Sequence, residues 1–141
     1  MKKYITLKEV LSWKPCITEQ QILEITKGKK RLSLFEVCNL KISHGDRIWV
    51  LLRSEILGKK IYREIVFKIA DQTVKKYCLK CGIRGVEKWA KNWLSEKNKS
   101  RAAAYTAAAY TAVANAAYAA ANAAYAERKW QLNLIKKYIK E

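Results

Sequence analysis

The chain has 141 residues, half of them hydrophobic, and its 29 Lys and Arg against 12 Asp and Glu give a formal charge of +17. The length suits one ordinary domain, and the apolar content can fill a real core. The charge excludes mimicry of DNA by an acidic surface and favours association with nucleic acid, nucleotides, anionic lipid or an acidic protein.

The N-terminal stretch "MKKYITLKEVLSW" begins with basic residues but lacks the apolar segment of a signal peptide. We therefore expect an intracellular protein whose four cysteines are reduced.

Three short helices are predicted by capping boxes, in which Ser or Thr precedes Glu or Gln by three residues. Pro15 is expected to close the first helix and Gly28 to end the second. The capping pairs are Thr6 with Glu9, Thr18 with Gln21, and Ser33 with Glu36.

Three longer helices are predicted next. Residues 43–58 form one with Ser43 as its cap and Gly58 as its end, and a further helix ends near Gly82. The third, over residues 85–97, gathers its apolar side chains on one side, and no long alternating run indicates a strand. Those apolar residues are Val86, Trp89, Ala90, Trp93 and Leu94.

Residues 102–126 carry no charge and consist largely of alanine, the best helix former. A membrane span is disfavoured because Val113 is the only aliphatic residue there larger than alanine, and because Asn115 and Asn122 lie in the middle. A straight helix over residues 101–140 would be about 60 Å long, against about 30 Å for the rest of the chain. The helix must therefore bend, break, protrude or pack against a second copy, as in a homodimer.

The expected fold is all-α: a compact bundle of short and medium helices with a long Ala-rich C-terminal helix. Residues 1–100 form a lysine-rich helical region, and residues 101–141 form the Ala/Tyr-rich helix packed on it within one structural domain.

One polar stripe follows the alanine helix at helical spacing. It is either the solvent side of the helix or a partner-binding surface, since tyrosine offers large contact area and asparagine adaptable hydrogen bonds. The stripe comprises Thr111, Asn115, Tyr118, Asn122, Tyr125 and Lys129.

Basic clusters at predicted helix ends and loops are candidates for polyanion binding, because loops that present several cations often contact phosphates. They are equally typical of solvated helix C-termini. The candidates are Lys27, Lys29, Lys30, Arg31, Lys59, Lys60, Lys80 and Arg84.

Cys78 and Cys81 have the spacing of a zinc or redox pair, but they are only weak metal candidates. A structural zinc needs two more ligands; the candidates are Cys16, Cys38 and His44, and none of these forms a close pair with another in the sequence. The single histidine has no nucleophile implied by spacing, and the isolated glycines form no phosphate loop. We therefore predict no enzyme activity and no cofactor.

Three blocks resemble the "putative immunity protein" sequences of phages and bacteria, an immunity-protein-five-like family. They are "ITLKEVLSWKPC", "DRIWVLLRSEILGKKIYREIVFKIADQTV", and the Ala/Tyr repeat that leads into "ERKWQ". The chain departs from the family in carrying "IRGVEKWAKNWL" before a short repeat that uses asparagine in place of aspartate. The resemblance implies a phage, prophage or toxin-immunity setting in the bacterial cytoplasm, and it supplies no catalytic residues to carry over.

Two functions follow as hypotheses. The first is an inhibitor or immunity protein, such as an anti-CRISPR-like antagonist, that neutralises a toxin or defence effector by stoichiometric binding. Its target would expose an acidic patch or bound nucleic acid. The second is a nucleic-acid-binding or nucleotide-binding protein that acts as a sponge, and a structural phage protein is a third, weaker alternative.

Overall fold

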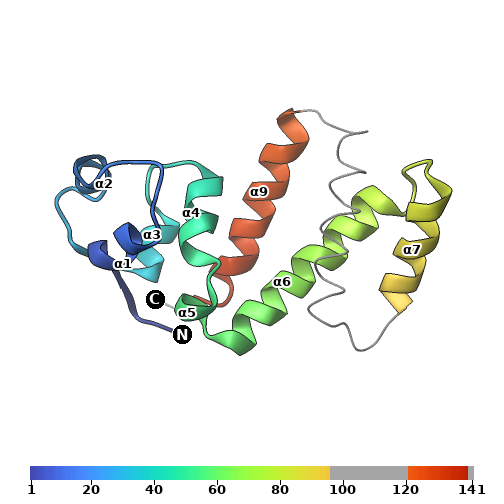
Figure 1. The fold of residues 1–141 in the computed structure, drawn as a ribbon, viewed down its shortest axis with the longest axis horizontal. Coiled ribbons are helices and arrows are strands. Elements are labelled where there is room, and N and C mark those ends of the chain that lie inside the picture. Colours follow the sequence, from blue (N-terminus) through green and yellow to red (C-terminus); the bar gives the residue numbers. More distant parts are fainter. Residues whose placement is uncertain (96–120, 140–141) are drawn as a thin grey trace. The chain divides into compact units, whose positions relative to one another are not determined.

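The computed structural model describes residues 1–95 and 121–139, and their fold is mostly helical, as the sequence predicts. Contacts divide the chain into two compact units (Figure 1). Unit 1 comprises Met1–Arg63 and Tyr125–Glu141, and unit 2 comprises Glu64–Ala124. The predicted boundary between residues 100 and 101 lies outside the described residues.

The three predicted capping boxes are confirmed. In each, the Ser or Thr hydroxyl accepts the N–H of the residue three positions later, whose side chain accepts the N–H of the capping residue. These caps begin α1 (Leu7–Ser12), α2 (Glu19–Ile25) and α3 (Leu34–Cys38).

Unit 1 also contains a small antiparallel sheet that the sequence does not predict. Strands β1 (Tyr4–Thr6) and β2 (Arg31–Ser33) pair with Ile5 opposite Leu32. Three residues are too few to show an alternating pattern, and the pairing joins segments far apart in sequence. The strands lead directly into α1 and α3, and because the strands are antiparallel, these two helices begin at opposite ends of the sheet.

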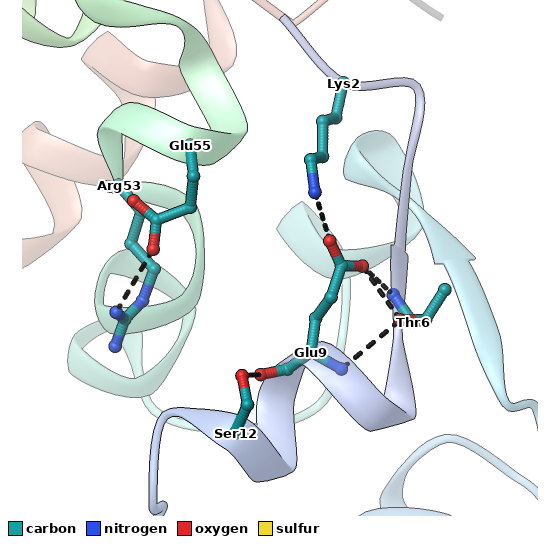
Figure 2. Close-up of polar contacts among 6 residues, drawn as sticks. All are labelled: Lys2, Thr6, Glu9, Ser12, Arg53 and Glu55. Atoms are coloured by element: carbon teal, nitrogen blue, oxygen red, sulfur yellow. Dashed lines mark hydrogen bonds and ion pairs between the residues drawn. The ribbon is translucent and has the colours of Figure 1, made fainter.

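The strand and helix at the N-terminus recur 27 positions later. Lys2, Lys3, Leu7, Glu9 and Val10 correspond to identical residues at 29, 30, 34, 36 and 37. Each copy has a strand, a capping box, and an ion pair between its first lysine and its glutamate (Figure 2 shows Lys2 and Glu9). The equivalent residues Ile5 and Leu32 face each other in an antiparallel pair, so a local two-fold relation connects the copies.

The prediction of one continuous helix over residues 43–58 is wrong, because the segment forms two helices. Helix α4 (His44–Leu51) ends at Leu52, whose ψ of 65° is not helical. Arg53 is extended, and α5 (Ser54–Leu57) ends at Gly58 with φ of 79°, where glycine is favoured. The N–H of Lys2 donates to the carbonyl of Ile56, which ties the N-terminal segment to α5.

Unit 2 has its own core. Helix α6 (Lys59–Thr73) continues as the π-helical turn η1 (Val74–Cys78), and α7 (Arg84–Ser95) packs on η1. The apolar side predicted for α7 is confirmed at Val86, Ala90 and Trp93, which are buried.

The described part of the C-terminal segment is α9 (Ala121–Lys136). Leu132 and Ile135 on this helix, and Ile139 beyond it, are buried in unit 1. Within residues 1–95 and 121–139, no helix combines the length and the apolar character that crossing a membrane requires.

Candidate binding pocket in unit 1

One concave surface of the described residues is a pocket of about 430 Å³ in unit 1, which we call the tryptophan pocket. Its lining comes from both copies of the repeated strand and helix, from α2 and from α4. Trp49, Ile17 and Ile25 line it and remain 40%, 41% and 36% exposed. Such exposed apolar side chains in a concavity are typical of a binding site. Its main apolar residues are Val10, Trp13, Ile17, Ile22, Ile25, Ile42, Trp49 and Val50.

Arg53 lies against two tryptophans of this pocket. Its guanidinium carbon is 4.1 Å from the ring centre of Trp13 and 4.5 Å from that of Trp49. The two indoles meet edge to face, with ring centres 6.0 Å apart. The Arg53 Nε donates to the Trp49 carbonyl at 3.1 Å. This arrangement holds one cation on an aromatic surface, where cation–π attraction is strongest for tryptophan.

Glu55 is the acidic neighbour of Arg53 (Figure 2). The Arg53 Nη1 and the Glu55 Oε1 are 3.7 Å apart, and the Glu55 side chain is about half exposed. The Arg53 side chain is less exposed, but an ion pair of this length with one partner open to solvent contributes little to stability. A carboxylate from a ligand could therefore replace Glu55 beside Arg53 at small cost.

The charged lining of the pocket is almost entirely basic. Asp46 is its only acidic residue, against Lys14, Lys29, Lys30, Arg31 and Arg53. Lys29 pairs with Glu36 at 2.6 Å, and the guanidinium of Arg31 lies 4.4 Å from the ring centre of Tyr4. Net positive charge at the rim of an apolar pocket fits a ligand that is both apolar and anionic.

The predicted polyanion-binding residues do not form one group. Lys29, Lys30 and Arg31 line the tryptophan pocket, whereas Lys27 is not among its lining residues. Lys59 and Lys60 begin α6 directly after Gly58 ends α5, so they lie at a helix start as well as a helix end. Lys80 and Arg84 belong to unit 2, on either side of Gly82.

The predicted partner-binding stripe is described only in part. Thr111, Asn115 and Tyr118 lie outside the described residues, and Asn122 lies in α9. Tyr125 is 61% exposed and its ring meets that of His44 edge to face, with ring centres 4.9 Å apart; Lys129 is exposed.

The cysteine pair lies in unit 2. Cys78 is buried in the core beside Val74 and Val86, and the half-buried Cys81 thiol is 3.9 Å from the Ile83 carbonyl oxygen. In the described part of the chain, no three His, Cys, Asp or Glu side chains gather in a way that could hold a metal ion.

Sequence reasoning missed Trp13, Trp49 and Arg53. Trp49 and Arg53 are four residues apart in the segment predicted as one helix, and this spacing was a usable signal for a cation–aromatic pair, although Arg53 lies beyond the end of α4. The contact of Trp13 with Trp49 had no such signal, because the two residues are far apart in the sequence.

A scan against protein-family models, a search of curated proteins and a search of solved structures each find no match to this chain. The resemblance to immunity proteins therefore stays a hypothesis, and the geometry of the pocket is the main ground for a function.

Proposed function

We propose that this chain is a non-catalytic inhibitor that neutralises a toxin or a bacterial defence effector by binding it one to one. In this proposal, the tryptophan pocket receives an apolar segment of the target that carries Asp or Glu. The supporting observation is the pocket itself, in which five basic side chains and one acidic side chain surround an apolar lining.

The size and composition of the pocket suit an anchor of a protein interface. Its volume of about 430 Å³ holds a few side chains, and it is smaller than a whole interface. Trp and Arg are the residues most often found to dominate interface affinity. Trp13, Trp49 and Arg53 would therefore carry most of the binding, with Lys30 and Arg31 guiding the acidic partner to the pocket.

The kind of target comes from the resemblance to phage and bacterial immunity sequences. The charge of +17 adds a constraint, because a basic inhibitor requires an acidic patch on its target or a target that exposes bound nucleic acid.

A designed peptide tests the pocket directly. The probe is a fluorescein-labelled peptide that alternates Leu or Phe with Asp or Glu, and the control peptide carries Lys in place of the acids. We expect the acidic peptide alone to bind, and Trp49→Ala and Arg53→Gln each to weaken binding about tenfold or more. The matched control Lys88→Gln, exposed on α7, should leave the affinity unchanged. Equal binding of the two peptides would contradict the pocket assignment.

Stoichiometric inhibition is tested on a target captured by the wild type and not by Trp49→Ala. Titration of the inhibitor into that target should abolish the target's activity at one equivalent. Continued activity at several equivalents, or turnover of the target, would exclude the inhibitor proposal.

A further inference from the structure

A second basic surface of unit 1 lies where α4 and α9 run side by side (Figure 1). It contains cations from segments about 80 positions apart in the sequence. We call it the α4–α9 basic face, and it comprises His44, Arg47, Tyr125, Arg128, Lys129 and Lys136.

Contacts bring these cations together around the first turn of α4. A Cβ added at Gly45 would lie 3.6 Å from the Arg128 Nη1, so that guanidinium packs over the glycine. Arg47 donates from Nη1 to the Cys38 carbonyl at 3.0 Å, and Lys136 donates from Nζ to the side chain of the next residue, Asn39, at 3.3 Å.

Several of these positive charges also act on the side chain of His44. Burial lowers the pKa of His44 below its ordinary value, and the charges of Arg47, Lys129 and Lys136 lower it further. Among the described residues, none of the cations Arg47, Arg128, Lys129 and Lys136 forms an ion pair.

Two acidic residues lie near this face in the sequence, Asp46 and Glu127. Asp46 accepts the Ser43 hydroxyl at 2.6 Å and lines the tryptophan pocket. Glu127 accepts a hydrogen bond from Gln131 on its own helix at 3.4 Å. The four cations repel one another, and an anionic ligand would relieve that repulsion.

An exposed aromatic ring lies within the same face. Tyr125 is 61% exposed, the highest fraction among the large apolar side chains identified as exposed in the described chain. Its edge-to-face contact with His44 holds the ring while leaving it open to solvent. A ring surrounded by cations is the arrangement by which proteins stack one base while they neutralise its phosphates.

We propose that the α4–α9 basic face binds single-stranded nucleic acid, with its phosphates at Arg47, Arg128, Lys129 and Lys136 and a base stacked on Tyr125. A single strand fits better than a duplex, because only an unpaired base offers its face to the ring. The site is separate from the tryptophan pocket and does not depend on the proposed inhibition. It would give an inhibitor a second contact on a target that carries bound nucleic acid.

The phosphate contacts are tested by fluorescence anisotropy with a labelled oligothymidylate of about 12 nucleotides in about 50 mM salt. The double variant Arg128→Gln, Lys129→Gln should bind at least tenfold more weakly. It should also lower the slope of log affinity against log salt by about 1.4, since each contact on a single strand contributes about 0.7. The control Lys88→Gln, Lys91→Gln removes the same charge from exposed positions of α7. An equal loss in this control would mean diffuse attraction and would overturn the site.

The base contact is tested by Tyr125→Ala and Tyr125→Phe. The alanine variant should lose about tenfold in affinity for the oligonucleotide, whereas phenylalanine should retain it, because both rings stack. Inorganic polyphosphate, which has no bases, should bind all three proteins equally. Loss of polyphosphate binding in Tyr125→Ala, or an unchanged oligonucleotide affinity, would refute the stacking role.

A variant in the tryptophan pocket distinguishes nucleic-acid binding at the α4–α9 basic face from peptide binding in the pocket. Trp49→Ala should leave oligonucleotide affinity unchanged while it weakens peptide binding about tenfold or more. An equal loss of oligonucleotide affinity in Trp49→Ala would place nucleic acid in the pocket and contradict the α4–α9 basic face.

Discussion

At the scale of single residues, Glu9 and Glu36 perform the same two tasks in the two copies of the repeat. Each accepts the backbone N–H and caps the helix, and each pairs with the lysine seven positions earlier. For Glu9, the hydrogen bond from Lys2, followed by those from Thr6, lowers the pKa to about 2. Lys29 and then Ser33 lower the pKa of Glu36 to about 2 in the same way.

These two carboxylates predict a specific acid sensitivity. A carboxyl whose pKa is lower in the folded state stabilises the fold above its unfolded value of 4.5, and this contribution is lost as the pH falls toward 2. We expect the free energy of unfolding of the wild type to fall across that interval, and that of Glu9→Gln, Glu36→Gln to fall less. For Glu9 the contribution is about 1 kcal/mol, because solvent screens a pair near the surface.

Urea unfolding at several pH values between 2 and 6 measures this effect. The control Glu19→Gln changes an exposed glutamate with no ion pair among those the structure identifies. Parallel pH profiles for the wild type and the double variant would show that the two glutamates do not act in this way.

At the scale of elements, local signals predicted the helices well. The predictions of α1, α2 and α3 from capping boxes are confirmed, because a cap depends only on residues three positions apart. The break at Leu52 and the pairing of Ile5 with Leu32 were missed, since both depend on contacts between distant segments. The tryptophan pocket was missed for the same reason, although the basic residues Lys29, Lys30 and Arg31 at its rim were identified as candidates.

Substitutions on the buried and exposed sides of α9 should differ in their effect on the free energy of unfolding. Ile135 is fully buried, so Ile135→Ala should destabilise unit 1 by about 2–5 kcal/mol. Tyr125 is mostly exposed, so Tyr125→Ala should change the unfolding free energy by no more than about 0.5 kcal/mol. Chemical denaturation monitored by circular dichroism makes the comparison, and similar costs for the two variants would contradict this placement of α9.

At the scale of the whole molecule, each unit contains one buried cysteine and one accessible cysteine. Cys38 is buried in unit 1 and Cys78 in unit 2, while Cys16 is exposed and Cys81 is partly exposed. Burial also raises the pKa of the Cys38 thiol, which further slows its reaction. We expect Cys16 and Cys81 to react rapidly with a thiol reagent in the folded protein, and Cys38 and Cys78 only after unfolding.

The buried thiols then report the stability of each unit separately. Ile135→Ala should lower the urea concentration at which Cys38 becomes reactive, and Val86→Ala should do the same for Cys78 alone. Mass spectrometry of labelled peptides measures both thiols in one sample. If either variant shifts both cysteines equally, the chain unfolds as one cooperative body.

The two copies of the repeated strand and helix also differ in the side chains that line the tryptophan pocket. A tandem duplication would account for two segments that share the same lysine and glutamate, each with a hydroxyl cap, and pair across the sheet. The copies have diverged at Tyr4 and Arg31 and at Trp13 and Leu40, and of these Trp13, Arg31 and Leu40 line the pocket. The two copies therefore line the pocket with different side chains. A ligand in such a pocket would make different contacts in its two orientations, so the two orientations would differ in binding free energy.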